Sequence, residues 1–213
     1  MAAADRLELV VVRHGLTAWN QERRYQGQRD IPLLLPDALD DLDRLRDSLA
    51  GEPLDAIYCS DLTRCRQTLA HVREGQDVEV KVVYDARLRE LDFGDFEGSC
   101  YDELKSIPTY RRWIDSQGER APPGGESAAQ MRARLQAWLD ECVTAATLHG
   151  HRRVLVVSHG GVIRELRRRF ETLDFWEGGV GQARGRRFML VQQGGGWQCS
   201  SSSAVPAPAS TNG

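Results

Sequence analysis

The sequence predicts an α/β fold, a three-layer α/β/α sandwich with a mostly parallel central sheet. Short aliphatic runs alternate with segments of helical periodicity, and two of the runs end in a histidine followed by glycine. These runs cover residues 9–12, before His14, and residues 154–157, before His159. Uninterrupted aliphatic strands are typical of parallel sheets covered on both faces. Because ligands of such sheets bind beyond the carboxyl ends of the strands, we expect both imidazoles in one pocket.

The first predicted element is a strand at residues 7–13, indicated by its apolar run. A polar loop that contains glycine follows over residues 20–30. Pro36 then opens a helix, because proline suits the first helical position and leucines recur behind it at helical spacing. These leucines are Leu39, Leu42, Leu45 and Leu49.

The middle of the chain continues this alternation. Residues 56–59 predict a short strand, and Ser60 or Asp61 is a suitable N-cap for the helix behind it. Residues 78–83 predict another strand. Residues 87–98 alternate acidic, aromatic and glycine residues without a clear period, which indicates a loop held in place for a purpose. A mixed helical region follows at residues 101–113.

The last third begins with proline and glycine residues that lead into the longest predicted helix, at about residues 128–148. The second histidine strand, a helix from Gly161 to about Phe170 and a final strand at residues 187–191 follow. We expect one domain over residues 1–199. The Ser/Ala/Pro-rich tail, residues 200–213, is predicted to be disordered.

Composition restricts the class of protein. The chain has 213 residues, 41% of them hydrophobic, which is enough for one sizeable core. A formal net charge of -3 supplies no overall field for nucleic acid or an anionic membrane, so we expect neither partner. No signal or transmembrane pattern is present, which predicts a cytoplasmic protein. The five cysteines include no Cys-x-x-Cys pair, so reduced thiols are expected.

The first chemical motif lies at the end of the first strand. Arg13 supplies a planar guanidinium that is able to bind two phosphate oxygens, and the adjacent His14 imidazole is able to act as a nucleophile. Gly15 permits a tight turn there. Taken alone, the segment is equally compatible with a surface arginine and a structural histidine.

Two further basic candidates follow strands. Arg64 lies in the first turn of a predicted helix, where its charge would add to the free backbone N–H groups of an anion site. On its own it is equally compatible with a solvated helix residue. His159 precedes Gly160 and Gly161, which give the backbone close access to a ligand.

Acidic candidates lie in the loop at residues 87–98. A carboxyl group near an imidazole nucleophile is able to protonate the leaving oxygen of a phosphoester and then to activate water. Spacing does not choose among the four acids of this loop, which are Glu90, Asp92, Asp95 and Glu97.

Together these segments resemble the histidine phosphatase superfamily, in which metal-independent phosphatases and phosphoglycerate mutases share one fold. The resemblance runs from residue 9 to about residue 170 and implies a phosphoglycerate mutase-like architecture. After Leu33 the chain departs from the family pattern, which predicts altered packing away from the phosphate pocket. The matching motifs are Arg13-His14-Gly15 with Asn20, Gln26-Gly27 to Leu33, residues 60–68, residues 88–98, residues 123–127 and Ser158-His159-Gly160.

The resemblance also implies a role for each site residue. His14 is implied to take the phosphoryl group as a phosphohistidine, and Glu90 to be the proton donor. Side-chain cations replace the usual magnesium in such a site, so neither a metal nor another cofactor is expected. The groups implied to bind the phosphoryl oxygens are Arg13, Arg64 and His159, and substrate-binding positions are implied at Thr17, Asn20, Gln26, Gly27 and Gly160.

The motifs look most like the small bacterial branch that contains α-ribazole phosphatases and broad-specificity phosphatases. This implies a phosphomonoester hydrolase for a small metabolite, with α-ribazole phosphate as one candidate. A phosphoglycerate mutase is the alternative, although the segment between Glu97 and Pro122 is short for the basic lid of a mutase.

Two other classes of function stay open from the residues alone. A metal-dependent hydrolase would use His14 and His159 as ligands together with His149 and His151. A phosphate-binding regulatory module would use the same pocket without catalysis. A sheet edge or an exposed helix is also able to pair two copies as a symmetric homodimer.

Overall fold

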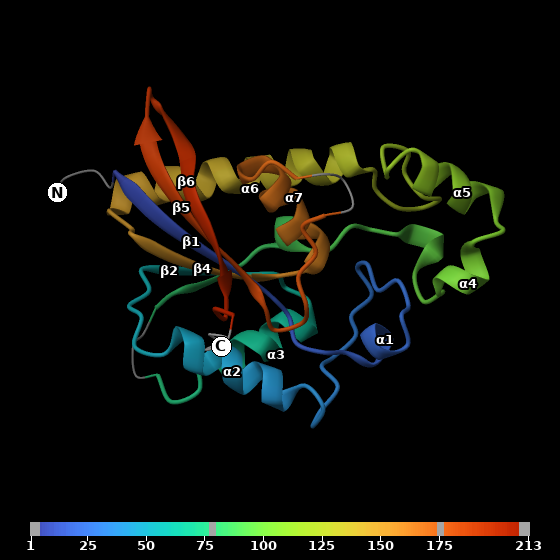
Figure 1. Ribbon diagram of the computed structural model, residues 1–213, viewed down its shortest axis with the longest axis horizontal. Coiled ribbons are helices and arrows are strands. Elements are labelled where there is room, and N and C mark those ends of the chain that lie inside the picture. The colour runs from blue at the N-terminus through green and yellow to red at the C-terminus, as the bar shows by residue number, and fades with distance from the viewer. Residues whose placement is uncertain (1–4, 77–79, 174–176, 209–213) are drawn as a thin grey trace, which may run out of the picture.

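Six strands form one sheet, most of it parallel (Figure 1). The computed structural model describes residues 5–76, 80–173 and 177–208 and gives the strand order β3-β2-β4-β1-β5-β6. The first four strands in this order run parallel, whereas β5 and β6 are antiparallel. The strands are β1 (Arg6–Arg13), β2 (Ala56–Cys59), β3 (Val82–Tyr84), β4 (Arg153–Ser158), β5 (Gly185–Gln193) and β6 (Gly196–Val205).

Helices cover both faces of the sheet, so the predicted three-layer sandwich is confirmed (Figure 1). Leu9 and Val11 of β1 pack in the core beneath α6 and α7, while Val10 and Val12 pack against α2 and α3. Alternate side chains of a strand point to opposite faces, which is why this continuous aliphatic run is buried on both. The helices are α1 (Ala18–Gln21), α2 (Leu39–Leu49), α3 (Thr63–Val72), α4 (Tyr101–Leu104), α5 (Pro108–Asp115), α6 (Ala128–His149) and α7 (Gly160–Phe170).

Two predicted boundaries are shifted. The helix expected to open at Pro36 begins at Leu39, because residues 35–38 form turns. The strand expected at residues 78–83 is β3, which starts at Val82, and positions 77–79 lie outside the described residues.

The predicted N-cap of α3 is wrong. Neither Ser60 nor Asp61 caps this helix: its N-cap position is Leu62, which makes no side-chain cap. Asp30 supplies the acceptors from a distant loop, with one oxygen 2.7 Å from the Thr63 backbone nitrogen and the other 2.7 Å from the Thr63 hydroxyl. The loop before α2 is therefore tied to the start of α3.

A separate aromatic cluster lies beyond the carboxyl edge of the parallel strands, where α4 and α5 form one end of the molecule (Figure 1). Phe96, Tyr110 and Trp113 are buried there, and Tyr25 and Phe93 pack against them. Neighbouring rings meet edge to face, for example Phe93 and Trp113 with centroids 5.7 Å apart. This small core supports a wall above the strand ends.

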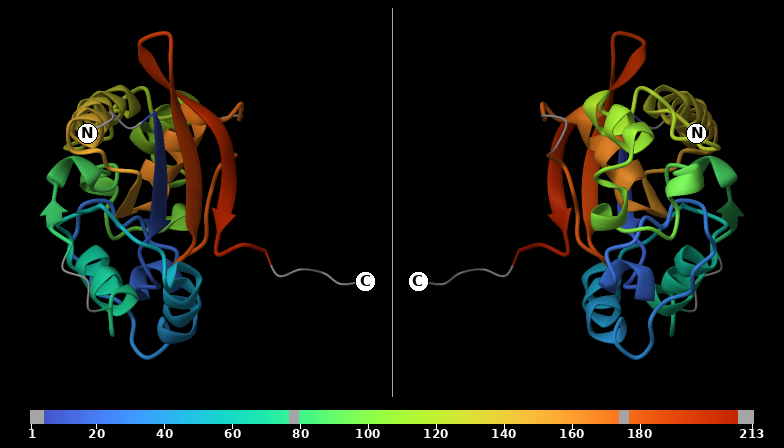
Figure 2. Two further views of the ribbon diagram at one scale, coloured as in Figure 1. Left: turned by 90° about the vertical axis from the view of Figure 1, so that its left-hand side faces the viewer. Right: turned by 90° about the vertical axis from the view of Figure 1, so that its right-hand side faces the viewer.

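The disordered tail predicted from residue 200 is wrong for residues 200–205, which belong to β6 (Figure 2). A turn at Gly194 and Gly195, both with positive φ, returns the chain along β5, and Val205 pairs with Gly185. A run of serines lacks hydrophobic alternation, but its backbone groups still complete the ladder with β5. Positions 209–213 lie outside the described residues.

Two expectations from the sequence concern the cysteines and membrane-spanning segments. All five cysteines are free thiols, and Cys59, Cys65 and Cys142 are buried, as expected for reduced packing residues. Within residues 5–76, 80–173 and 177–208, no helix is long and apolar enough to cross a membrane.

Truncation after residue 199 is predicted to destabilise the fold. It removes the second half of β6 and the Val205 side chain, which is 3% exposed. Burial of one such side chain contributes about 1.5–3 kcal/mol, so the free energy of unfolding should fall by at least about 2 kcal/mol in urea denaturation. Truncation after Pro208 is the matched control and should leave the urea midpoint unchanged. Equal midpoints for the two truncations would contradict a structural role for β6.

Candidate functional site

The two strand-end histidines meet, as predicted. His14 follows β1 and His159 follows β4, and these strands are parallel neighbours in register, with Arg13 opposite Ser158. The two rings lie edge to face with centroids 5.2 Å apart. Both side chains are buried, at 3% and 0% exposure. The carboxyl ends of adjacent parallel strands thus bring together two residues that are far apart in the chain.

His14 presents an unprotonated nitrogen. Its Nδ1 lies 2.7 Å from the carbonyl oxygen of Gly15. A carbonyl oxygen only accepts hydrogen bonds, which assigns the proton to Nδ1 and leaves the lone pair on Nε2. The Gly15 backbone N–H in turn donates to the Thr68 hydroxyl at 2.9 Å, which holds the turn in place. The imidazole is therefore oriented and in the tautomer of a nucleophile.

Arg64 is a fully buried cation beside this pair. Its guanidinium donates to the carbonyl oxygens of Gly27 and Arg29, both at 2.7 Å. Its Nε also lies 3.3 Å from Nδ1 of His159. Because arginine only donates, Nδ1 of His159 must accept. The proton is therefore on Nε2, which lies 2.8 Å from the Ser60 hydroxyl oxygen. Ser60, expected to cap α3, instead orients His159.

Burial lowers the pKa of His14 well below its ordinary value, and the charges of Arg64 and Arg13 lower it further. The pKa of His159 is also lowered well below the ordinary value, first by burial and then by Arg64. Both effects disfavour the charged imidazolium. The two rings are therefore neutral at neutral pH, and the positive charge of the site resides on arginines.

Arg13 lines a pocket of about 380 Å³ above the strand ends. One of its terminal nitrogens donates to the carbonyl oxygen of Val180 at 2.8 Å. A Cβ atom on Gly160 would lie 3.2 Å from the centre of the guanidinium, so glycine at this position leaves space for the arginine. Gly160 thus shapes the pocket as the first residue of α7.

Of the four acids in the loop, Glu90 is the one that lines this pocket. Its carboxylate accepts the backbone N–H groups of Leu91 and Gly161, both at 2.9 Å. A Cβ on Gly161 would lie 2.1 Å from the carboxylate, so this contact also requires glycine. Glu90 therefore lies in the same pocket as Arg13, and its role as proton donor stays a prediction.

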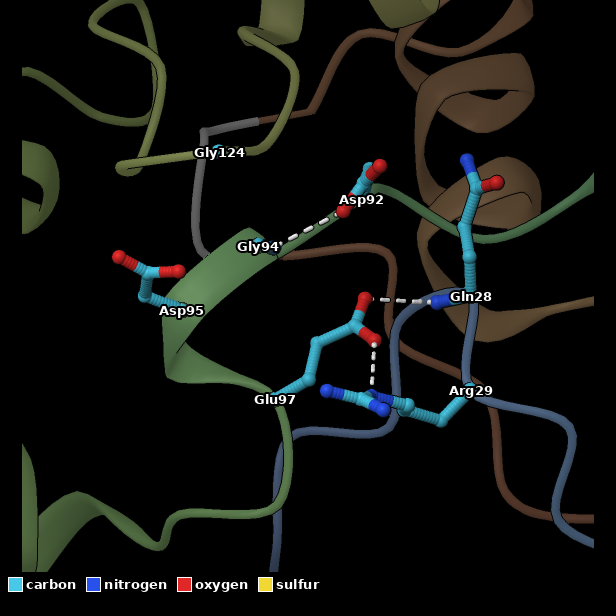
Figure 3. A pocket seen from close by; sticks show the side chains of 7 residues that line it. All are labelled: Gln28, Arg29, Asp92, Gly94, Asp95, Glu97 and Gly124. Atoms are coloured by element: carbon cyan, nitrogen blue, oxygen red, sulfur yellow. Dashed lines mark hydrogen bonds and ion pairs between the residues drawn. The ribbon is translucent and has the colours of Figure 1, made fainter.

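The other three acids line a neighbouring hollow of about 570 Å³ (Figure 3). Glu97 accepts from the Gln28 backbone N–H at 2.8 Å and lies 3.5 Å from Arg29, while Asp92 accepts from the Gly94 N–H. Burial raises the pKa of Glu97 above its ordinary value. Asp92 and Glu97 thus hold turns of the loop, and none of the three acids lines the pocket that contains Arg13.

Of the predicted substrate-binding residues, Gly160 lines the pocket that contains Arg13, whereas the other four do not. Thr17 and Asn20 form the capping box of α1, in which the Asn20 side-chain oxygen accepts from the Thr17 N–H and hydroxyl. Gly27 offers its carbonyl to Arg64, and a Cβ there would collide with Glu97 at 1.8 Å. Gln26 is buried, and its side-chain oxygen has no hydrogen-bond partner within the described residues. Direct contact of these residues with a substrate stays a prediction.

Arg134 of α6 is a residue that sequence reasoning missed. Its guanidinium donates to the backbone carbonyls of Arg87, Arg89 and Glu90 at 2.5, 2.8 and 3.0 Å. The intervening carbonyl, that of Leu88, accepts from the Ser158 hydroxyl at 2.7 Å. The backbone carbonyls of residues 87–90 are thus held by the side chains of Arg134 and Ser158.

Glu126 completes this arrangement. It forms an ion pair with Arg134, and its backbone and side chain pair with the backbone of Asp92. The proline and glycine residues before Glu126 therefore deliver a carboxylate to the other side of the Glu90 loop. The sequence signal that could have revealed this ion pair is the spacing of Glu126 and Arg134, which is about two helical turns.

The metal-ligand set proposed as a rival is not brought together. His149 and His151 precede β4, whereas His159 follows it, so the length of the strand separates them from His14. Within the described parts of the chain, no group of three or more His, Cys, Asp or Glu side chains is placed to hold a metal ion.

Comparison with known proteins agrees with the family resemblance of the sequence motifs. Residues 9–203 match the sequence profile of the histidine phosphatase superfamily (branch 1). The chain is 34% identical over 171 residues to a 2,3-bisphosphoglycerate-dependent phosphoglycerate mutase of Azorhizobium caulinodans, covering 76% of this chain and 80% of that protein. It is 33% identical over 155 residues to phosphoserine phosphatase 1 of Hydrogenobacter thermophilus, covering 72% and 71%.

The fold is shared with solved structures. The crystal structure of the α-ribazole phosphatase from Shigella flexneri superimposes with a TM-score of 0.77, covering 91% of this chain and 94% of that one. The sequence identity of this pair is 22%, so the match establishes the architecture and leaves the substrate open.

The free energy of unfolding should depend on the two buried histidines below pH 6.5. Because their pKa values are lower in the folded chain than the ordinary 6.5, the folded state binds fewer protons and stability is lost as pH falls. Each histidine contributes up to about 1.4 kcal/mol per pH unit. Urea denaturation between about pH 6.5 and 5.5 should give a shallower slope for His14→Asn than for the wild type. The exposed His149→Asn is the matched control, and identical slopes for all three proteins would contradict the assignment.

Loss of Arg134 should loosen the Glu90 loop specifically. In Arg134→Gln, amide hydrogen exchange in peptides covering residues 87–91 should accelerate by at least about tenfold, since hydrogen bonds to a charged group are lost. Arg132→Gln removes an exposed arginine of the same helix, paired with Glu119, and should leave this loop unchanged. If exchange in residues 87–91 is no faster in Arg134→Gln than in Arg132→Gln, Arg134 does not hold the loop.

Proposed function

This chain belongs to the histidine phosphatase superfamily, and from that premise we propose that it is a phosphomonoester hydrolase that works through a phosphohistidine. The observation that carries the proposal is the neutral His14, with its proton fixed on Nδ1 and two arginines beside it. A phosphoryl group is bound by such cations and attacked by such a nitrogen. The proposed substrate is a small phosphorylated metabolite.

In the first step, the His14 Nε2 lone pair attacks phosphorus and the bond from phosphorus to the ester oxygen breaks. Arg13 and Arg64 stabilise the charge on the phosphoryl oxygens, which is the main catalytic requirement of phosphoryl transfer. In the tautomer set by Arg64 and Ser60, the single ring N–H of His159 donates to Ser60 and is not available to the phosphoryl group. We therefore assign it the role of holding Arg64 and lining the phosphoryl site.

Glu90 is the proposed proton donor to the leaving oxygen. It lines the same pocket as Arg13, and its orientation is fixed by Gly161 and by the Arg134 contacts of its loop. In the second step, Glu90 takes a proton from water, the water oxygen attacks phosphorus, and the bond from phosphorus to Nε2 breaks. Inorganic phosphate leaves, and His14 and Glu90 return to their starting forms.

The segment above the pocket supports hydrolysis over mutase activity. A mutase retains its substrate under a basic lid so that the phosphoryl group is returned to a second hydroxyl. Residues 113–118 provide the corresponding wall here with Trp113, Ile114, Gln117 and Gly118, none of which is charged. The nearby cations Lys105 and Arg111 are exposed and paired with Asp102 and Asp115. These residues therefore do not form the basic lid of a mutase.

Phosphoglycerate mutase is the alternative function, because relatives of similar identity are named as a mutase and as a phosphatase. α-Ribazole phosphate is a candidate substrate that rests on the sequence motifs and on a shared fold at 22% identity. Both compounds therefore belong in the first substrate panel.

The proposal predicts metal-independent phosphate release that requires His14. Phosphate should be released from at least one member of a phosphomonoester panel in EDTA, and His14→Ala should reduce kcat by at least about 1000-fold while keeping a cooperative thermal transition. Acid-labile phosphate on His14 should be detected by mass spectrometry after a rapid quench at high pH.

Three outcomes discriminate among the candidate functions. Interconversion of 3- and 2-phosphoglycerate without net phosphate release would establish the mutase. Binding of phosphomonoesters with neither reaction would favour a regulatory module. Full activity in His14→Ala would exclude the phosphohistidine.

A further inference from the structure

The pocket beside Glu90 contains a second arginine that the proposed reaction does not use. Arg164 of α7 lines this pocket together with Arg13. Residues three and four positions apart share one face of a helix, so Arg164 lies on the same face as Gly160 and Gly161. Gly160 contacts the Arg13 guanidinium and Gly161 binds the Glu90 carboxylate. Arg164 is therefore one helical turn from the reacting groups.

Arg164 has no acceptor in the described parts of the chain. Its Nε is buried and makes no hydrogen bond there. Its neighbour Arg167 is paired with Glu171 at 2.8 Å, and Arg168 is paired with Glu165 at 3.1 Å. Glu165 also lines the pocket, but its carboxylate is already paired with Arg168. A buried donor without an acceptor is costly, which indicates that an acceptor arrives with a ligand.

The charge of Arg164 also acts on Arg13 across the pocket. Burial lowers the pKa of Arg13, Glu90 opposes this effect, and the charge of Arg164 lowers the pKa further. The Nε of Arg13 is likewise buried without a hydrogen-bond partner among the described residues. The two oxygens of Glu90 already accept backbone N–H groups. Two like charges thus face one small pocket, and an anion between them would relieve their repulsion.

We propose that Arg164 binds a second anionic group of the substrate, a carboxylate or a second phosphate, while Arg13 and Arg64 bind the phosphoryl group that is transferred. This inference rests on the proposed phosphatase function and names its substrate class. Apart from Glu90 and Glu165, the remaining lining residues are uncharged and include Phe93, Trp113, Ile114 and Met131. A pocket of about 380 Å³ limits the substrate to a compact skeleton that joins the two anions.

Matched substrates test this subsite. Phosphoserine and phosphoethanolamine differ by one carboxylate, and propane-1,3-diol bisphosphate differs from its monophosphate by one phosphate. Wild-type kcat/KM should favour the member with the second anion in at least one pair, and that pair identifies which anion is recognised. In Arg164→Gln the preference should fall about 10- to 100-fold, the range for one hydrogen bond to a charged group. Arg164→Lys should retain part of it, because the charge remains.

Arg169→Gln is the matched control, since it removes an exposed arginine of the same helix that does not line the pocket. Its preference should equal that of the wild type. An unchanged preference in Arg164→Gln would overturn the subsite even when the enzyme is an active phosphatase.

Calorimetric binding of the same pairs to His14→Ala and to His14→Ala with Arg164→Gln tests the subsite without turnover. A difference in affinity that depends on Arg164 would support the subsite even if no ester is hydrolysed, in which case the proposed function alone fails. Equal affinities within every pair would overturn it.

Discussion

The buried Arg64 is the group on which the rest of the site depends. A guanidinium without exposure to solvent requires acceptors, and this one finds them in the carbonyls of Gly27 and Arg29 and in the ring of His159. The loop at residues 26–30 is thereby folded over the start of α3, where Asp30 also caps the helix. The tautomer of His159 follows from the same contact. One cation therefore organises a loop, a helix terminus and an imidazole.

The acceptors of Arg64 are dipoles, so its positive charge is not cancelled. This explains how the site keeps a strong positive field in a chain whose formal net charge is -3. Burial is the largest cause that lowers the pKa of His14, and this field lowers it further, so both favour the neutral ring. The same field is available to oxyanions that enter beside it. The charge that helps to keep His14 neutral is thus the same charge that we propose to attract the phosphoryl group.

Local patterns in the sequence predicted the parts of the site that depend on them. The aliphatic runs predicted β1 and β4, and parallel strand ends then required His14 and His159 to meet. The cap of α3 by Asp30 was missed because it joins residues far apart in the chain. β6 was missed because serines carry no apolar period, although backbone pairing with β5 needs none. Arg134 was missed because its acceptors are backbone carbonyls, which every sequence contains.

Arg134 and Arg64 hold neighbouring loops by the same means but have different electrostatic consequences. Both donate to backbone carbonyls of one loop, yet Arg134 is also paired with Glu126, whereas Arg64 forms no ion pair within the described residues. Burial is the largest cause that lowers the pKa of His159, Arg64 is the next, and Arg134 contributes less. A neutralised clamp suits the loop of Glu90, because the proposed role of this residue is to release and accept a proton. An uncompensated clamp suits the phosphoryl site, where excess positive charge binds the oxyanions. Glu126 therefore offsets the charge of the arginine that holds the Glu90 loop, whereas the charge of Arg64 beside His159 has no paired carboxylate within the described residues.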